Sequence, residues 1–359
     1  MSRDIRALVD LAALVHNAGV ARAAAPRSRM LAVVKANAYG HGLIQVARTL
    51  AEQADGYAVS CLEEAIALRD AGLDKPILLL EGFFDAAELP LIERCRLDCA
   101  VHSAWQIDML ERYNAERPIS VWLKVDSGMH RLGVRPEQTP ACYQRLRECR
   151  SVAEHVRLMT HLAFADDRDD AYTRYQFAEF ERATAGLPGE RSVGNSAGVL
   201  AWPGSRTDWV RPGIMLYGAS PFADGRPERP PLRPVMTLRS RLVAVRPCRK
   251  GERIGYAGRF ECPEDMTVGV VAAGYGDGYP RHAPNGTPVL VDGRRTGIVG
   301  RVSMDMLCVD LRGIEHVAPG ADVTLWGEGL PVEEIAAACG TISYELLCKL
   351  TQRVRFEYI

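Results

Sequence analysis

The chain has 359 residues, of which 47% are apolar and 25% charged, and its formal net charge is −1. Such a composition is ordinary for a globular protein, and the length suggests about two domains. A nearly neutral chain gives no reason to expect nucleic acid or an anionic membrane as partner, and no apolar stretch approaches the ~20 residues of a membrane span. The opening residues MSRDIRALVDLAALVHN lack a signal-peptide pattern, so we expect a cytoplasmic protein.

The ten cysteines are scattered along the chain. They form no C-x-x-C pair that is joined by a second pair or by nearby histidines, so the sequence predicts no metal site. Free thiols in a reducing compartment are the simpler interpretation.

The first part of the chain alternates short apolar runs with helical patterns. The runs predict strands at residues 30–35, 56–60, 76–81, 98–102, 119–126, 155–163, 191–195 and 210–218. Helical periodicity predicts helices at 43–54, 62–71, 105–113, 138–149 and 172–183, and Asp85 and Ser103 are candidate N-caps of two such segments. Alternating strands and helices pair in parallel, and about eight units close a (β/α)8 barrel of the TIM type; an open doubly wound sheet is the alternative.

The composition changes at residues 220–235, SPFADGRPERPPLRPV, which contain five prolines and few apolar residues. Such a segment is typical of an interdomain linker. Beyond it, β-branched runs separated by glycine turns predict a mostly antiparallel β-domain with one helix at 331–339 and a closing segment at 343–359. The predicted domains are therefore residues 1–225 and 226–359.

Lys35 stands directly after the apolar run 30–34, at the C-terminal end of the first predicted barrel strand. Barrel enzymes place catalytic groups there, and a buried neutral lysine amine can form a Schiff base with an aldehyde. The alternative is a lysine that extends from the strand end into solvent. The following residues ANAYGHG (36–42) favour a functional role, because they predict a tight polar loop before a new helix.

Two further loops, NSAG (195–198) and RPGI (211–214), follow the seventh strand and the start of the eighth. Barrels frequently bind phosphate at this position, and small residues let a phosphate approach the backbone amides. Each loop alone could be an ordinary turn, but their occurrence together favours a phosphate site.

The fifth strand ends in LKVDSGMHRLGV (123–134), which contains Lys124, Asp126 and Arg131. Arg131 could bind a carboxylate through two parallel hydrogen bonds, whereas a salt bridge between Lys124 and Asp126 is the competing interpretation. His161, at the end of the sixth strand, could be functional or a hydrogen-bonded core histidine.

Three loops of the β-domain are polar and aromatic: RIGYAGRF (253–260), GYGDGYPR (274–281) and GRVSMDM (300–306). A tyrosine among them would ionise readily near neutral pH only if its pKa fell by about three units, which requires nearby cations. Arg211, His161 and Arg281 are candidates if the second domain faces a barrel mouth.

Six motifs, AVVKANAYGHG, DSGMHRLGV, RPGIMLYG, GYAG, GYGDGYPR and GRVSMDM, together resemble those of the bacterial alanine racemases. The resemblance runs in order from the first helix to the C-terminus. It implies pyridoxal 5'-phosphate as cofactor, L- and D-alanine as substrates, and a homodimer whose active sites are shared between subunits. The product would supply peptidoglycan synthesis, or D-alanine would be broken down.

The resemblance also implies roles for individual residues. Lys35 would hold the cofactor as a Schiff base and act as one base, while Tyr256 of the partner subunit would act as the other, connected through His161 to Arg211. The cofactor-binding residues would be Lys35, Tyr39, Asn195, Ser196, Arg211, Gly213, Ile214 and Tyr344. Arg131 and the backbone of Met304 would bind the substrate carboxylate, and a carbamylated Lys124 would position Arg131. Tyr275, Arg281, Arg301 and Asp305 would form the substrate entrance.

Three rival functions share the barrel and the cofactor. A decarboxylase of basic amino acids would need a cysteine acid and a longer β-domain, for which no motif is present; a racemase of wider specificity would look similar. A non-catalytic pyridoxal-phosphate carrier would be a single barrel, whereas a second domain follows the linker here.

Overall fold

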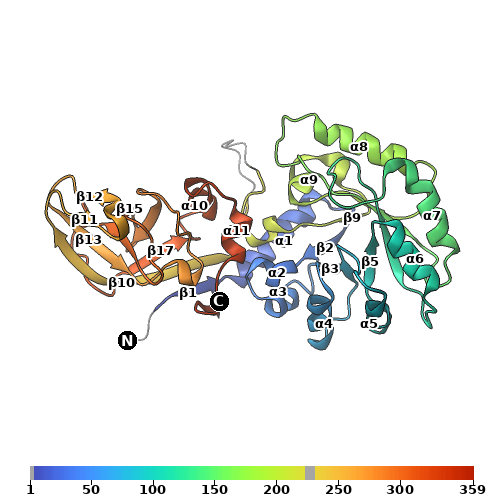
Figure 1. Ribbon diagram of the computed structural model, residues 1–359, viewed down its shortest axis with the longest axis horizontal. Helices are drawn as coiled ribbons and strands as arrows, with labels where there is room; N and C mark the ends of the chain where they lie inside the picture. Colours follow the sequence, from blue (N-terminus) through green and yellow to red (C-terminus); the bar gives the residue numbers. More distant parts are fainter. Residues whose placement is uncertain (1–3, 223–230) are drawn as a thin grey trace.

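The computed structural model describes residues 4–222 and 231–359. In the first part of the protein, eight parallel strands close into a barrel (Figure 1). The strands, in barrel order, are β2 (Arg29–Val33), β3 (Gly56–Val59), β4 (Ile77–Leu79), β5 (Asp98–Val101), β6 (Ser120–Lys124), β7 (Arg157–Met159), β8 (Arg191–Ser192) and β9 (Trp209–Val210). The predicted barrel is confirmed. Its strands read as continuous apolar runs because both of their faces are buried.

The helices of this part lie between the strands in the chain, and the five segments with predicted helical periodicity all contain one. They are α1 (Leu11–Ala24), α2 (Lys35–Tyr39), α3 (Leu43–Thr49), α4 (Leu62–Asp70), α5 (Leu89–Arg94), α6 (Ala104–Arg112), α7 (Thr139–Glu148), α8 (Tyr172–Ala183) and α9 (Ser196–Ala201). Asp85 forms a capping box with Glu88 on the 3₁₀ turn that leads into α5. Ser103 stands at the N-cap position of α6 but makes no capping hydrogen bond through its side chain.

The barrel strands are shorter than predicted. The sixth predicted strand, 155–163, contains only β7, and the eighth, 210–218, ends at Val210. Pro212 has no N–H to donate to a strand ladder, and residues Ile214–Tyr217 form a 3₁₀ turn instead. The apolar residues of this turn are buried beneath the barrel mouth, which explains why the sequence resembled a strand.

A second, mostly antiparallel sheet has the order β13-β16-β15-β14-β17-β10-β1-β18, with a further pairing of β13 to β10. Its strands are β1 (Arg6–Val9), β10 (Met236–Cys248), β13 (Met266–Val271), β14 (Pro288–Val291), β15 (Arg294–Val299), β16 (Leu307–Asp310), β17 (Asp322–Trp326) and β18 (Arg355–Tyr358). A small hairpin, β11 (Arg253–Ile254) and β12 (Phe260–Glu261), and the helices α10 (Val332–Ala338) and α11 (Ser343–Cys348) accompany it.

The N-terminal strand β1 belongs to this second sheet rather than to the barrel. It pairs antiparallel with β10 and parallel with β18, and its alternate residues Ala7 and Val9 are fully buried. The predicted domain 1–225 therefore includes a strand that lies outside the barrel. The centre of the predicted linker 220–235, residues 223–230, lies outside the described residues, and so does the proposed boundary at 225.

The two parts share one continuous buried core. Helix α11 lies between the barrel and the sheet (Figure 1). It packs against the end of α2 so closely that a Cβ on Gly40, the residue after α2, would overlap the carbonyl oxygen of Leu347. Residues late in the chain thereby reach the barrel mouth. Within the described residues, no helix has the length and apolar character needed to cross a membrane.

Candidate active site

A cavity of about 620 Å³ opens where the barrel strands end. Lys35 follows β2, Glu81 follows β4, Lys124 ends β6, His161 follows β7 and Arg211 follows β9, and all five line the cavity. Enzymes built on this barrel carry their active sites at this face.

Most of the predicted site residues meet in this one cavity. Its lining includes Lys35, Tyr39, Lys124, Arg131, His161, Asn195, Ser196, Arg211, Gly213, Ile214 and Tyr344. Lining residues that the sequence analysis missed are Val33, Ala36, Leu80, Glu81, Leu132, Met159 and Cys348. Glu81 ended a predicted strand just as Lys35 did, so its position at a strand end was the signal that could have found it.

The remaining predicted residues do not line this cavity. Tyr256 is 68% exposed and Met304 is 52% exposed. Arg281 and Arg301 line a separate cavity of about 350 Å³ with Arg259. The others are Tyr275, which is also exposed, and Asp305, which forms an ion pair with Arg353. The cavity of one chain therefore contains only part of the predicted set.

Lys35 begins the segment α2, whose other residues form an unusual left-handed turn rather than a right-handed helix. Ala36, Asn37, Ala38 and Tyr39 have φ values of 53°, 54°, 55° and 51°, in the left-handed region. Left-handed helical geometry costs L-residues about 1–2 kcal/mol each, so it needs support from the surrounding structure. The strand therefore ends at Val33, two residues earlier than predicted, and the turn lets both Lys35 and Tyr39 line the cavity.

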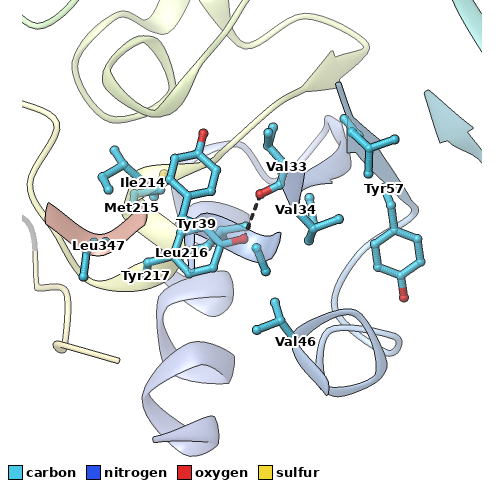
Figure 2. Close-up of a cluster of buried hydrophobic side chains, with 14 of the residues drawn as sticks. Val33, Val34, Tyr39, Val46, Tyr57, Ile214, Met215, Leu216, Tyr217 and Leu347 are labelled. Atoms are coloured by element: carbon cyan, nitrogen blue, oxygen red, sulfur yellow. Dashed lines mark hydrogen bonds between the residues drawn. The ribbon is translucent and has the colours of Figure 1, made fainter. Parts of the chain in front are cut away.

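Hydroxyl and amide groups form a polar cradle at one side of the cavity. The N–H groups of Gly213 and Met215 donate to the Ser196 hydroxyl at 2.9 and 3.3 Å. Asn195 caps α9 by accepting from the Gly198 N–H at 2.9 Å. The Tyr39 ring stacks on the Tyr217 ring, with the two ring centroids 4.7 Å apart (Figure 2). Burial raises the pKa of the Tyr39 phenol, so the phenol stays protonated and can donate a hydrogen bond.

Position 213 needs glycine because there is no room for a side chain, and not because of its backbone angles. A Cβ at this position would overlap the Tyr39 hydroxyl and approach Val33. We expect Gly213→Ala to displace Tyr39 and to lower the free energy of unfolding by about 1–3 kcal/mol, as overpacking usually does. Denaturant unfolding measures this. The control is Gly19→Ala inside α1, where a Cβ meets nothing within 4 Å and should stabilise by about 0.5–1 kcal/mol. Equal stability of Gly213→Ala and the native chain would contradict the close packing.

Arg211 lines the cavity but is otherwise buried, at 3% exposed. It donates to the Ser192 hydroxyl and to the Thr160 carbonyl, both at 2.6 Å, and its Nη2 lies 3.4 Å from His161 Nδ1. Burial lowers the pKa of Arg211 to about 10, so the guanidinium remains charged at neutral pH. Because a guanidinium can only donate, His161 Nδ1 accepts and the neutral imidazole carries its proton on Nε2. Burial and the charge of Arg211 hold the pKa of His161 well below its usual range.

Lys124 is 7% exposed, and burial, with the charges of Arg211 and Arg131, lowers its pKa to about 8. The loop after β6 returns to its own strand, because the Val134 N–H donates to the Lys124 carbonyl at 2.9 Å. Asp126 accepts from backbone N–H groups of this loop and pairs with His130 at 3.2 Å, rather than with Lys124. The returning loop fixes Arg131 at the cavity.

The charges of the cavity suit an anionic ligand. Four basic side chains line it, and Glu81 is the one carboxylate among its lining residues, all of which are described. An excess of positive charge in a partly closed site attracts and concentrates anions.

Comparisons with known proteins agree with this geometry. A family model described as alanine racemase, N-terminal domain, matches residues 9–221, and one described as alanine racemase, C-terminal domain, matches residues 235–358. The chain belongs to the alanine racemase family. It is therefore an enzyme, as the sequence predicted.

The relatives in this family match over their whole length. The chain is 55% identical to an alanine racemase of Thioalkalivibrio sulfidiphilus over all of both chains, and 51% identical to a catabolic alanine racemase of Pseudomonas putida over 99% of each. A crystal structure of a biosynthetic alanine racemase from Pseudomonas aeruginosa superposes with a TM-score of 0.96 at 46% identity, covering 99% of both chains.

Proposed function

We propose that this member of the family interconverts L-alanine and D-alanine with pyridoxal 5'-phosphate as cofactor. The observation that carries the proposal is that Lys35, the polar cradle of Ser196, Gly213 and Tyr39, and the buried cation Arg211 all border one cavity. An aldehyde, a phosphate and a ring nitrogen would each find a matching group there.

The residues fit this cofactor. The Lys35 amine would hold its aldehyde carbon covalently, and the phosphate would be bound by Tyr39, Ser196, Gly213, Ile214 and Tyr344. Asn195 would also belong to the cofactor site. When bound, the cofactor withdraws electrons from the Cα of an attached amino acid. Arg211 would donate to the pyridine nitrogen, and because it stays protonated it disfavours protonation of that nitrogen. We expect the resulting weaker withdrawal to limit side reactions.

Racemisation requires two groups that exchange protons with opposite faces of Cα. Lys35 Nζ would serve one face. Tyr256 of the partner subunit would serve the other, because Tyr256 lies on the exposed hairpin loop and not at the cavity of its own chain. The enzyme would therefore act as a homodimer with shared sites. His161 and Arg211, which lie 3.4 Å apart, would support this tyrosine.

The substrate carboxylate would be bound by Arg131 and by the backbone of Met304, which is also exposed on the second domain. Lys124 suits carbamylation, because a pKa near 8 leaves part of its amine neutral at neutral pH. The neutral amine would add to carbon dioxide and release a proton, giving a carbamate anion next to Arg131. Tyr275, Arg281, Arg301 and Asp305 would line the entrance. The product would supply peptidoglycan synthesis, or D-alanine would be consumed, in the cytoplasm where the ten free thiols stay reduced.

The test is a racemase assay of the purified full-length chain with each enantiomer of alanine, serine, lysine and arginine, with the visible spectrum recorded before and after addition of pyridoxal phosphate. We expect alanine to be turned over in both directions and the spectrum to show covalently held cofactor. Equal turnover of all four amino acids would favour the racemase of wider specificity. A chain that binds the cofactor but racemises none of them would contradict the proposal.

A further inference from the structure

A buried histidine, His41, forms hydrogen bonds to the left-handed turn between Lys35 and Gly40. The Nδ1 of His41 lies 3.1 Å from the Ala38 carbonyl oxygen and 2.9 Å from the Tyr39 carbonyl oxygen. Since carbonyls only accept, this nitrogen must carry the proton and donate to both. Both carbonyls belong to residues with positive φ, so the donor engages the strained part of the turn directly.

His41 can serve in this way because it is neutral and fixed. Its side chain is fully buried, and burial lowers its pKa to about 4. It does not line the cavity, so it touches neither the cavity space nor a ligand held there. Its effect on the site must therefore pass through the turn.

Tyr217 connects the turn to the end of strand β2. The centroid of its ring lies 4.7 Å from that of the Tyr39 ring and 4.6 Å from that of the His41 ring. Its hydroxyl donates to the Val33 carbonyl at 2.9 Å, two residues before Lys35 (Figure 2). Tyr217 thus joins Val33, the last residue of the strand, to Tyr39 at the end of the turn and to His41 beyond it.

We infer that His41 and Tyr217 are positioning residues that hold the left-handed turn, so that Lys35 before it and Tyr39 at its end both face the cavity. The inference rests on the proposed function, because it is Lys35 and Tyr39 that would hold the cofactor. Without the His41 donor, two carbonyls in a strained backbone lose a partner, and the turn should relax toward ordinary right-handed geometry. Relaxation would move both side chains together.

The test uses three variants of the full-length protein. His41→Phe keeps a ring but removes the donor, and His41→Asn places an amide donor at the position of Nδ1. Tyr217→Phe removes only the hydrogen bond to Val33. The matched control is His155→Phe, which alters an exposed histidine before β7. Two readouts are independent of turnover: the dissociation constant for pyridoxal phosphate, and hydrogen exchange of the amides of residues 34–42 without cofactor.

We expect His41→Phe to weaken cofactor binding by at least tenfold and to speed exchange of these amides by at least tenfold. His41→Asn should restore both to within about threefold of the native chain. Tyr217→Phe should shift both in the same direction by a smaller factor, and His155→Phe should change neither. In turnover, kcat should fall in His41→Phe while KM for alanine changes little.

Unchanged exchange and binding in His41→Phe and Tyr217→Phe would overturn the inference. If His41→Phe does not fold, His41→Asn and Tyr217→Phe still decide, because the first should behave like the native chain and the second should loosen the turn. Failure of the proposed function looks different: the native chain itself would then bind no pyridoxal phosphate, while the exchange of residues 34–42 would still respond to His41.

Discussion

Lys35→Ala should reduce alanine racemisation by roughly 10⁴-fold or more and remove the visible absorbance of covalently held cofactor, since nucleophile removal typically costs this much. The amine sits at the strand end, while the neighbouring turn is held by backbone and by residues other than its side chain. We therefore expect the variant to remain folded. Turnover of both enantiomers and the absorption spectrum measure the effect, and Lys250→Ala, at an exposed turn, is the surface control.

The other cavity lysine provides a sharper control. Lys124 lines the same cavity, and its pKa of about 8 leaves part of its amine free to react. Borohydride reduction of the loaded native chain makes the bond between lysine and cofactor permanent, and peptide mapping then identifies the residue. We expect the label on Lys35 in the native chain and in Lys124→Ala. A label on Lys124 would contradict the assignment of Lys35.

The sequence predicted the barrel and much of its site for a physical reason. A parallel barrel strand is buried on both faces, so it appears as a short apolar run, and the residue that follows it reaches the catalytic face. Lys35, Lys124 and His161 were all found in this way, and they line one cavity. Loops with small residues likewise located Ser196 and Gly213.

What the sequence did not reveal depends on long-range contacts or on strain. β1 is four residues long, and its partners β10 and β18 lie more than two hundred residues away, so no local pattern marks it as part of the second sheet. The left-handed turn is formed by Ala, Asn, Ala and Tyr, and only asparagine among these visits that region readily. Of its two supports, His41 is close in sequence but looked like an ordinary loop residue, whereas Tyr217 lies far along the chain in a segment that was predicted to be a strand.

The roles of Tyr256 and Met304 were predicted only from the family resemblance. Both are exposed on the second domain and do not line the cavity of their own chain. The roles proposed for them would require a second subunit, so they stay predictions that a dimer experiment must test.

Tyr256→Phe should slow exchange of the Cα hydrogen of one alanine enantiomer by about 10²–10⁴-fold, the range that a positioned acid–base group supplies. The other enantiomer should still lose its hydrogen to Lys35. Proton NMR in deuterated water, with each enantiomer tested separately, measures both rates. Tyr175→Phe is the matched control, because Tyr175 is another exposed tyrosine, at 53%, on helix α8. Equal, unchanged exchange of both enantiomers would contradict the two-base proposal.

Mixing the two inactive variants tests the sharing of sites. In a dimer of one Lys35→Ala subunit and one Tyr256→Phe subunit, one site lacks both groups and the other combines a native Lys35 with a native Tyr256. Random reassortment makes half of the dimers mixed, so about one quarter of the native activity should return. If Lys35 and Tyr256 of the same chain formed each site, every site in the mixture would carry one defect. No activity would then return, and the shared-site proposal would fail while the role of each residue could still stand.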